Sequence, residues 1–164
     1  MNNFFKSLFI ITLSIFFVHS NVFAAVSSVD EIETEMDKIM QLNETDFDSF
    51  YNRSEMIGAN KSSFNIVSSE YKLKNKASID SLSKIISTIN DIEGSEEFSD
   101  SDKNSQINEL IQKANEELNK TSNNAINYVT NLGPYMPTIT YNRFKAAFIN
   151  YYNDLYINEN QIEL

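Results

Sequence analysis

The side chains on which nucleophilic and metal-dependent catalysis most often relies are scarce in this sequence. Its 164 residues include no cysteine, no tryptophan and a single histidine, His19. A reaction would therefore have to rest on carboxylates, tyrosine, lysine or serine. The acids from which a glycan-cleaving pair could be drawn are Glu96, Glu97, Glu116 and Glu117. Their polar neighbours place these acids in a loop or on the solvent side of a helix, so we expect no enzyme, no metal and no cofactor.

One segment has part of the ligand spacing of a calcium-binding loop. Acids or amides fill positions 1, 3, 5 and 9 when Asp100 is counted as position 1. Ser105 stands where the loop needs glycine, and Ile111 stands where it needs a bidentate glutamate. Ile107 and Ile111 also follow a helical apolar spacing. The segment therefore predicts the start of a helix, capped by Ser99 or Asp100, rather than a calcium site.

Residues 1–24 have the pattern of a secretory signal peptide. Lys6 precedes an apolar run over 8–18, and Ala24 follows small and apolar residues at the position where signal peptidase cleaves. The run is too short to span a bilayer of roughly 30 Å. We expect cleavage after Ala24, which removes the only histidine and leaves one domain, residues 25–164. The protein is then exported to the periplasm or the exterior of a bacterial cell.

The chain is acidic, with 13 basic and 23 acidic side chains and a net charge of −10. Nucleic acid is excluded as an expected partner because binding it requires a basic footprint. A basic protein partner fits this charge, although acidity alone also keeps an exported protein soluble. The one basic cluster, Lys72, Lys74 and Lys76, is typical of a solvated helix face or a polar break in a helix.

Three glycines and two prolines are few for a chain of this length, which favours α-helix throughout. Gly58, Gly94 and Gly133 each follow an apolar segment with helical spacing. We expect each glycine to end a helix in the left-handed conformation.

Five apolar stripes predict the helices. They contain Ile32, Met36, Ile39 and Met40, preceded by Ser28 as a cap; Phe47, Phe50, Tyr51 and Ile57; Phe64, Val67, Tyr71, Ile79, Leu82, Ile86 and Ile89, starting at Ser62 or Ser63; Ile107 to Leu132; and Phe144, Phe148, Tyr151 and Leu155. The third stripe crosses the lysine cluster, where the helix could break. The expected fold is all-α: a single-domain antiparallel bundle of four to five helices.

The final helix carries a second apolar stripe, turned roughly 80 to 100° from the first. It contains Tyr141, Ile149, Tyr152 and Tyr156, and Tyr135 precedes it between two prolines. Tyrosine suits an interface because its ring packs while its hydroxyl stays in water. We predict these five residues as a partner-binding surface. The alternative is that the helix lies centrally and buries both stripes.

The leading functional hypothesis is an exported, non-catalytic helical protein that acts by binding another protein. It could serve as an immunity or inhibitor protein, a secretion accessory or a host-interaction protein. One alternative is a lipid- or membrane-binding amphipathic protein, which the acidic, Asn-rich and Ser-rich polar faces do not favour. The other is a carboxylate-dependent glycan hydrolase. No motif identifies a family, and the oligomeric state does not follow from the sequence.

Overall fold

The computed structural model describes residues 25–48, 51 and 56–156. These residues include the helices α2 (Val29–Glu44), α4 (Lys61–Gly94), α5 (Asp100–Leu132) and α6 (Thr138–Tyr156), and a 3-10 turn, η1 (Gly133–Tyr135). Phe47, Asp48 and Tyr51, between α2 and α4, are also helical. No strand occurs in these ranges, so the predicted all-α class is confirmed. The predicted signal segment, its cleavage site after Ala24 and Phe50 lie outside the described residues.

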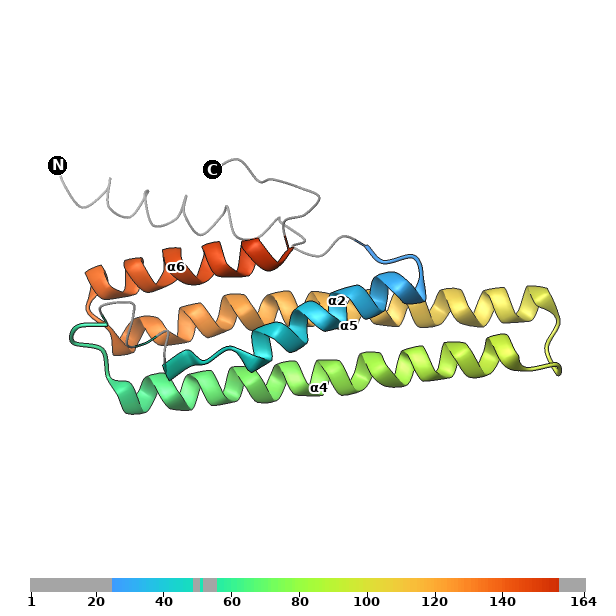
Figure 1. Ribbon diagram of the computed structural model, residues 1–164, viewed down its shortest axis with the longest axis horizontal. Coiled ribbons are helices and arrows are strands. Elements are labelled where there is room, and N and C mark those ends of the chain that lie inside the picture. Colours follow the sequence, from blue (N-terminus) through green and yellow to red (C-terminus); the bar gives the residue numbers. More distant parts are fainter. Residues whose placement is uncertain (1–24, 49–50, 52–55, 157–164) are drawn as a thin grey trace.

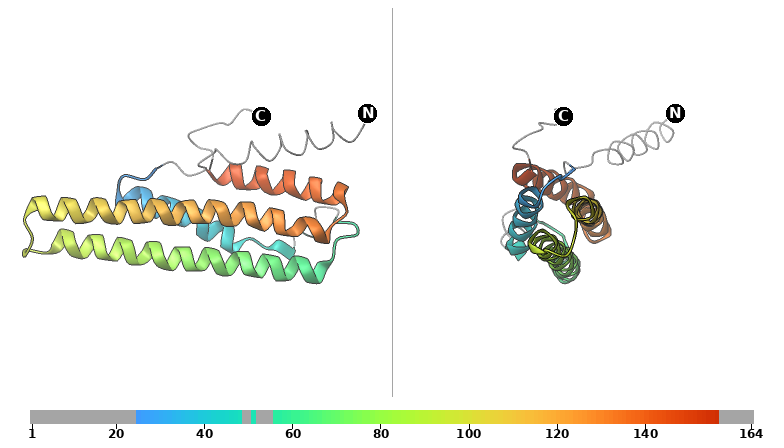
Figure 2. Two further views of the ribbon diagram at one scale, coloured as in Figure 1. Left: turned by 180° about the vertical axis from the view of Figure 1, so that it is seen from behind. Right: turned by 90° about the vertical axis from the view of Figure 1, so that its right-hand side faces the viewer.

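The two longest helices form the axis of the molecule. α4 and α5 lie side by side and run in opposite directions, joined by a short loop over 95–99 (Figure 1). α2 and α6 pack along part of this hairpin, and α4 and α5 extend beyond both of them (Figure 2). We call the extending end the acidic end, because its loop carries Glu96 and Glu97. The opposite end, where Pro134 and Pro137 lie, is the proline end.

Short polar side chains fix where three of the helices begin. Ser28 caps α2, Asn60 caps α4 and Ser99 caps α5, each accepting a hydrogen bond from a backbone N–H three residues ahead. Such bonds satisfy N–H groups that have no partner within the helix. The caps at Ser28 and Ser99 agree with the sequence analysis. α4 begins earlier than the expected Ser62 or Ser63, because the Asn60 amide caps it.

α4 is one continuous helix of 34 residues, so of the two interpretations of the lysine cluster the helix break is wrong. The inward line of α4 continues through this region with polar side chains, Asn75 and Ser78, which are 0% and 2% exposed. Lys74 and Lys76 are exposed to solvent. Lys72 is half-buried, and its Nζ lies 5.2 Å from the centre of the Phe47 ring. An apolar stripe cannot reveal a helix whose buried positions are polar at that point.

Only one glycine has the left-handed conformation expected of all three. Gly58 has φ of +77°, whereas Gly133 has φ of −51° and Gly94 is the last residue of α4. The expectation is therefore wrong for Gly94 and Gly133. α4 ends because Ser95 is extended. At Gly133 the chain tightens from α5 directly into η1, and Pro134, which has no N–H to donate, follows.

The core consists of two apolar clusters along the α4–α5 hairpin. The cluster nearer the proline end is largely aromatic and includes Phe64, Tyr71, Tyr128, Phe144 and Phe148. The cluster nearer the acidic end is aliphatic and includes Val26, Ile32, Ile39, Leu82, Ile86, Ile89 and Leu118. Between them the buried residues of α4 and α5 are polar: Asn75, Ser78, Thr121 and Ser122. The helices that complete the two clusters differ, since α6 contributes only to the aromatic one.

Candidate functional site at the proline end

The proline end is built from two turns that are far apart in the sequence and lie against each other. One turn contains Gly58, and the other leads through η1 and Pro137 into α6. A Cβ atom on Gly58 would lie 2.9 Å from Pro137 Cγ, closer than such atoms approach in proteins. The positive φ and this contact both require glycine. The two turns therefore meet at van der Waals distance.

Three hydrogen bonds hold the Gly58 turn in place. The Asn60 backbone N–H donates to the Tyr135 carbonyl at 2.9 Å. The Thr140 hydroxyl donates to the Ile57 carbonyl at 2.8 Å, and the Tyr51 hydroxyl donates to the Ala59 carbonyl at 3.0 Å. The turn thus has a fixed backbone, because its carbonyls pair with side chains from elsewhere in the chain.

Three large apolar side chains project from this fixed backbone into solvent. Ile57 is 75% exposed, Ile139 is 70% exposed and Tyr135 is 42% exposed. We call these three residues the end surface. Isolated exposed apolar residues are ordinary, but a group of them on one rigid end is a typical feature of a binding surface.

The structure separates the five residues predicted to bind a partner. Tyr135 belongs to the end surface. Tyr141 and Ile149 are partly buried, and Tyr152 is only 6% exposed. The side chain of Tyr156 lies outside the described residues. Tyr152 is thus a core residue in the folded chain, and the predicted surface stripe does not stay together.

The aromatic ladder of α6 explains why Tyr152 is buried. Phe144, Phe148 and Tyr152 follow each other at intervals of four residues, and neighbouring rings stack at 5.9 and 6.1 Å. Phe144 and Phe148 are buried as predicted. Tyr151 and Leu155, the other members of the expected inner line, are only partly buried, and the Tyr151 hydroxyl lies 2.8 Å from the Thr45 hydroxyl. The inward face of α6 therefore includes Tyr152, whereas the apolar spacing predicted Tyr151 on that face.

Sequence reasoning missed the two most exposed members of the end surface. Ile57 was assigned to the inner stripe of a short helix, but it lies in the turn that precedes α4. Ile139 lies in the first turn of α6. Its position, roughly 140° around the helix from Phe144, was the available signal that it points away from the core.

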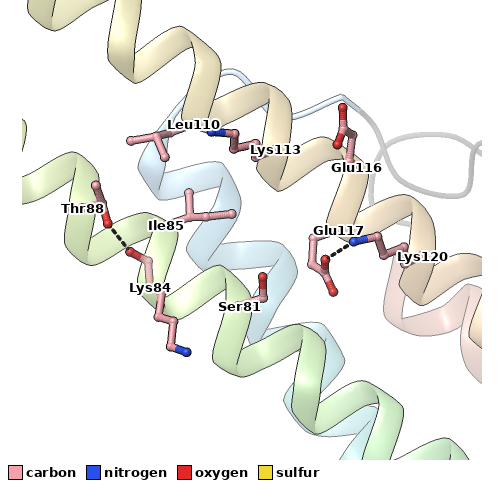
Figure 3. A pocket seen from close by; sticks show the side chains of 9 residues that line it. All are labelled: Ser81, Lys84, Ile85, Thr88, Leu110, Lys113, Glu116, Glu117 and Lys120. Atoms are coloured by element: carbon pink, nitrogen blue, oxygen red, sulfur yellow. Dashed lines mark hydrogen bonds and ion pairs between the residues drawn. The ribbon is translucent and has the colours of Figure 1, made fainter.

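The acids considered for glycan cleavage do not form an isolated pair. Glu96 and Glu97 are exposed in the loop of the acidic end. Glu117 accepts hydrogen bonds from Ser78 at 2.9 Å and Lys120 at 2.8 Å. Glu116 points away from it in Figure 3. Glu117 is therefore engaged in contacts within the fold.

Glu116 and Glu117 line a shallow groove between α4 and α5. The groove has a volume of about 330 Å³ and is open to solvent; its other lining residues are Ser81, Lys84, Ile85, Thr88, Leu110, Lys113 and Lys120 (Figure 3). Lys113 pairs with Glu109 and Lys120 with Glu117, both at 2.8 Å. Three lysines and two glutamates line the groove, and Glu109, the partner of Lys113, lies outside the lining.

The segment with partial calcium-loop spacing is helical. α5 begins at Asp100, and the Ser99 hydroxyl accepts a hydrogen bond from the Asp102 N–H. A loop that wraps a cation cannot form from residues already in a helix. Within the described ranges, no three His, Cys, Asp or Glu residues come together in a way that could hold a metal.

None of the helices in the described part of the chain is both long and apolar enough to cross a membrane. No protein-family model, no curated protein and no solved structure matches this chain.

Proposed function

We propose that this protein is an exported antiparallel helical bundle that acts by binding another protein. Cleavage of its signal peptide after Ala24 would yield the mature bundle. The observation that supports binding is the end surface, where Ile57, Tyr135 and Ile139 are exposed on one end of the fold. A non-catalytic role fits the sequence, which without its predicted signal peptide contains neither cysteine nor histidine.

The rigidity of the end surface favours protein binding. Ordering a flexible surface on association costs free energy, and a surface already fixed by its own hydrogen bonds avoids that cost. Tyrosine is also a typical anchor at the centre of protein interfaces. The net negative charge of the chain favours a basic partner through long-range attraction.

Site-specific photo-crosslinking in the producing cells tests this proposal. The full chain would carry a photoreactive phenylalanine analogue in place of Ile139, and, as a matched control, in place of Leu73. Leu73 is 68% exposed on α4 and lies outside the end surface. We expect a discrete protein crosslink from position 139 in the exported fraction and none of the same mass from position 73.

A second pair of variants tests whether the apolar side chains contribute to binding. Ile57→Ser, tested with the crosslinker at 139, should weaken the crosslinked band, whereas Ile66→Ser should leave it unchanged. Ile66 is also an exposed isoleucine, on α4. Equal bands in both variants would contradict the proposal. Crosslinks from position 139 to lipid alone would favour the membrane-binding alternative instead.

A further inference from the structure

The first described residues are held against a distant helix by one side chain. The Asn115 Oδ1 atom accepts a hydrogen bond from the Val26 N–H at 2.8 Å, and its Nδ2 atom donates to the Val26 carbonyl at 2.9 Å. The amide of Asn115 thus pairs with both backbone polar groups of Val26. Nδ2 also donates to the Ile111 carbonyl on the same helix at 3.1 Å, which orients the amide.

The side chain of Val26 is part of the core. It is 5% exposed and belongs to the aliphatic cluster with Ile32, Leu82 and Leu118. Its backbone and side chain are therefore both engaged by the folded domain. Ala25, immediately before it, is exposed.

The next two residues are also fixed. Both the N–H and the hydroxyl of Ser27 donate hydrogen bonds to Glu31 Oε2. These bonds stabilise the carboxylate and lower the pKa of Glu31. Ser28 then caps α2. Every residue from Val26 to Ser28 is thereby held in place.

We propose that Asn115 is a clamp that closes the signal-peptide cleavage site once the domain has folded. This inference rests on the proposed export, because the cleaved bond is the one expected between Ala24 and Ala25. An extended peptide that docks on a protein by strand addition is held through its backbone N–H and carbonyl groups, so we expect a protease to need these groups free near the cleaved bond. Val26 is the second residue after that bond, and its N–H and carbonyl are already paired with Asn115.

The clamp gives processing a fixed order. Cleavage occurs while residues 25–28 are undocked, and docking then protects the new N-terminus. An aminopeptidase can remove exposed Ala25, but it stops at Val26, because releasing Val26 requires breaking two hydrogen bonds and exposing an apolar side chain. We therefore expect the mature protein to start at Ala25 and, where an aminopeptidase acts on it, to be trimmed no further than Val26.

Two protease assays on the purified full chain test the clamp. In the first, signal peptidase acts on the folded precursor and on the precursor unfolded in urea at a concentration the enzyme tolerates. We expect the folded precursor to be cut at least tenfold more slowly. In the second, an aminopeptidase trims the processed protein, and mass spectrometry reports where trimming stops. We expect it to stop before Val26.

Asn115→Ala removes the clamp, and Asn108→Ala is its matched control, since Asn108 is exposed on α5 two turns earlier. Loss of the two bonds should raise the cleavage rate of the folded precursor by about tenfold. It should also let trimming pass Val26. The control variant should behave as the wild type. If Asn115→Ala proves too unstable to purify, Val26→Ala serves in its place. This variant keeps the backbone bonds but loses core contacts, so its cleavage rate should rise by less than tenfold.

Equal cleavage rates for the wild type, Asn115→Ala and Asn108→Ala would overturn the clamp. So would trimming of the wild type beyond Val26 at the rate of the Asn115→Ala variant. If signal peptidase cuts neither the folded nor the unfolded precursor, the predicted cleavage after Ala24 is wrong. The trimming assay, run on a chain cut to begin at Ala25, then still decides whether Asn115 protects Val26.

Discussion

The hydroxyl of Thr140 donates a 2.8 Å hydrogen bond to the carbonyl of Ile57, a residue 83 positions earlier in the chain. Thr140 is buried, and its bond to Ile57 is partly buried. It fixes the backbone of one exposed isoleucine, Ile57, to the helix that carries the other, Ile139. The end surface therefore depends on a polar contact beneath it as much as on the apolar side chains themselves.

Thr140→Val tests that contact, because valine has nearly the shape of threonine but cannot donate a hydrogen bond. The carbonyl of Ile57 would lose its partner, and the free energy of unfolding should fall by about 0.5 to 1.5 kcal/mol. Urea denaturation followed by circular dichroism measures the change. Thr88→Val is the matched control, since Thr88 is exposed and its hydroxyl bonds only to the Lys84 carbonyl within α4. An equal loss in both variants would show that the Ile57 contact contributes nothing.

Gly58→Ala should destabilise the proline end. Alanine at φ of +77° costs about 1 to 2 kcal/mol, and its Cβ would press on Pro137 Cγ at 2.9 Å. Thermal unfolding should therefore begin at a lower temperature. Gly94→Ala is the control, because a Cβ at Gly94 meets nothing within 4 Å. That variant should be neutral or more stable by up to about 1 kcal/mol. A Gly58→Ala protein as stable as Gly94→Ala would contradict the assigned turn geometry.

The helices could be predicted because their signals are local. Apolar spacing located α2, α5 and α6, and the short polar side chains of Ser28 and Ser99 marked two of their starts. The continuity of α4 was not predictable in this way. Ser78 bonds to Glu117 on α5, and Asn75 is fully buried, but a single helix's sequence does not show that its polar residues are covered by a neighbour.

The candidate site was harder to predict because exposure depends on contacts across the fold. Tyr135 was found from its position between two prolines. Tyr152 belongs to a stripe that predicts either a partner-binding surface or a second buried face, and α6 packs with that ring against Phe148. The exposure of Ile57 follows from a turn that is held by residues far along the chain. Thr140 donates to the Ile57 carbonyl, and the Asn60 N–H donates to the Tyr135 carbonyl. No local pattern contains that information.

Two stacked tyrosines in the aromatic cluster predict how stability responds to alkaline pH. The rings of Tyr71 and Tyr128 lie 4.6 Å apart, and both residues are buried. Burial raises the pKa of Tyr71 from 10.0 to about 12 and raises the pKa of Tyr128 as well, although the Ser68 hydroxyl partly offsets the latter. Both tyrosines therefore stay neutral in the folded protein at pH values where the unfolded chain has already lost these protons.

Because the folded pKa lies above the unfolded one, the stability that these tyrosines contribute is complete below pH 10 and is lost as the pH rises toward 12 and beyond. In that window each tyrosine lowers the free energy of unfolding by up to about 1.4 kcal/mol per pH unit. Urea denaturation at pH 8, 10 and 11 measures the slope. Tyr71→Phe should reduce the slope above pH 10 and leave the curve parallel to that of the wild type between pH 7 and 9. A slope unchanged in Tyr71→Phe and in Tyr128→Phe would show that tyrosine burial does not govern alkaline unfolding.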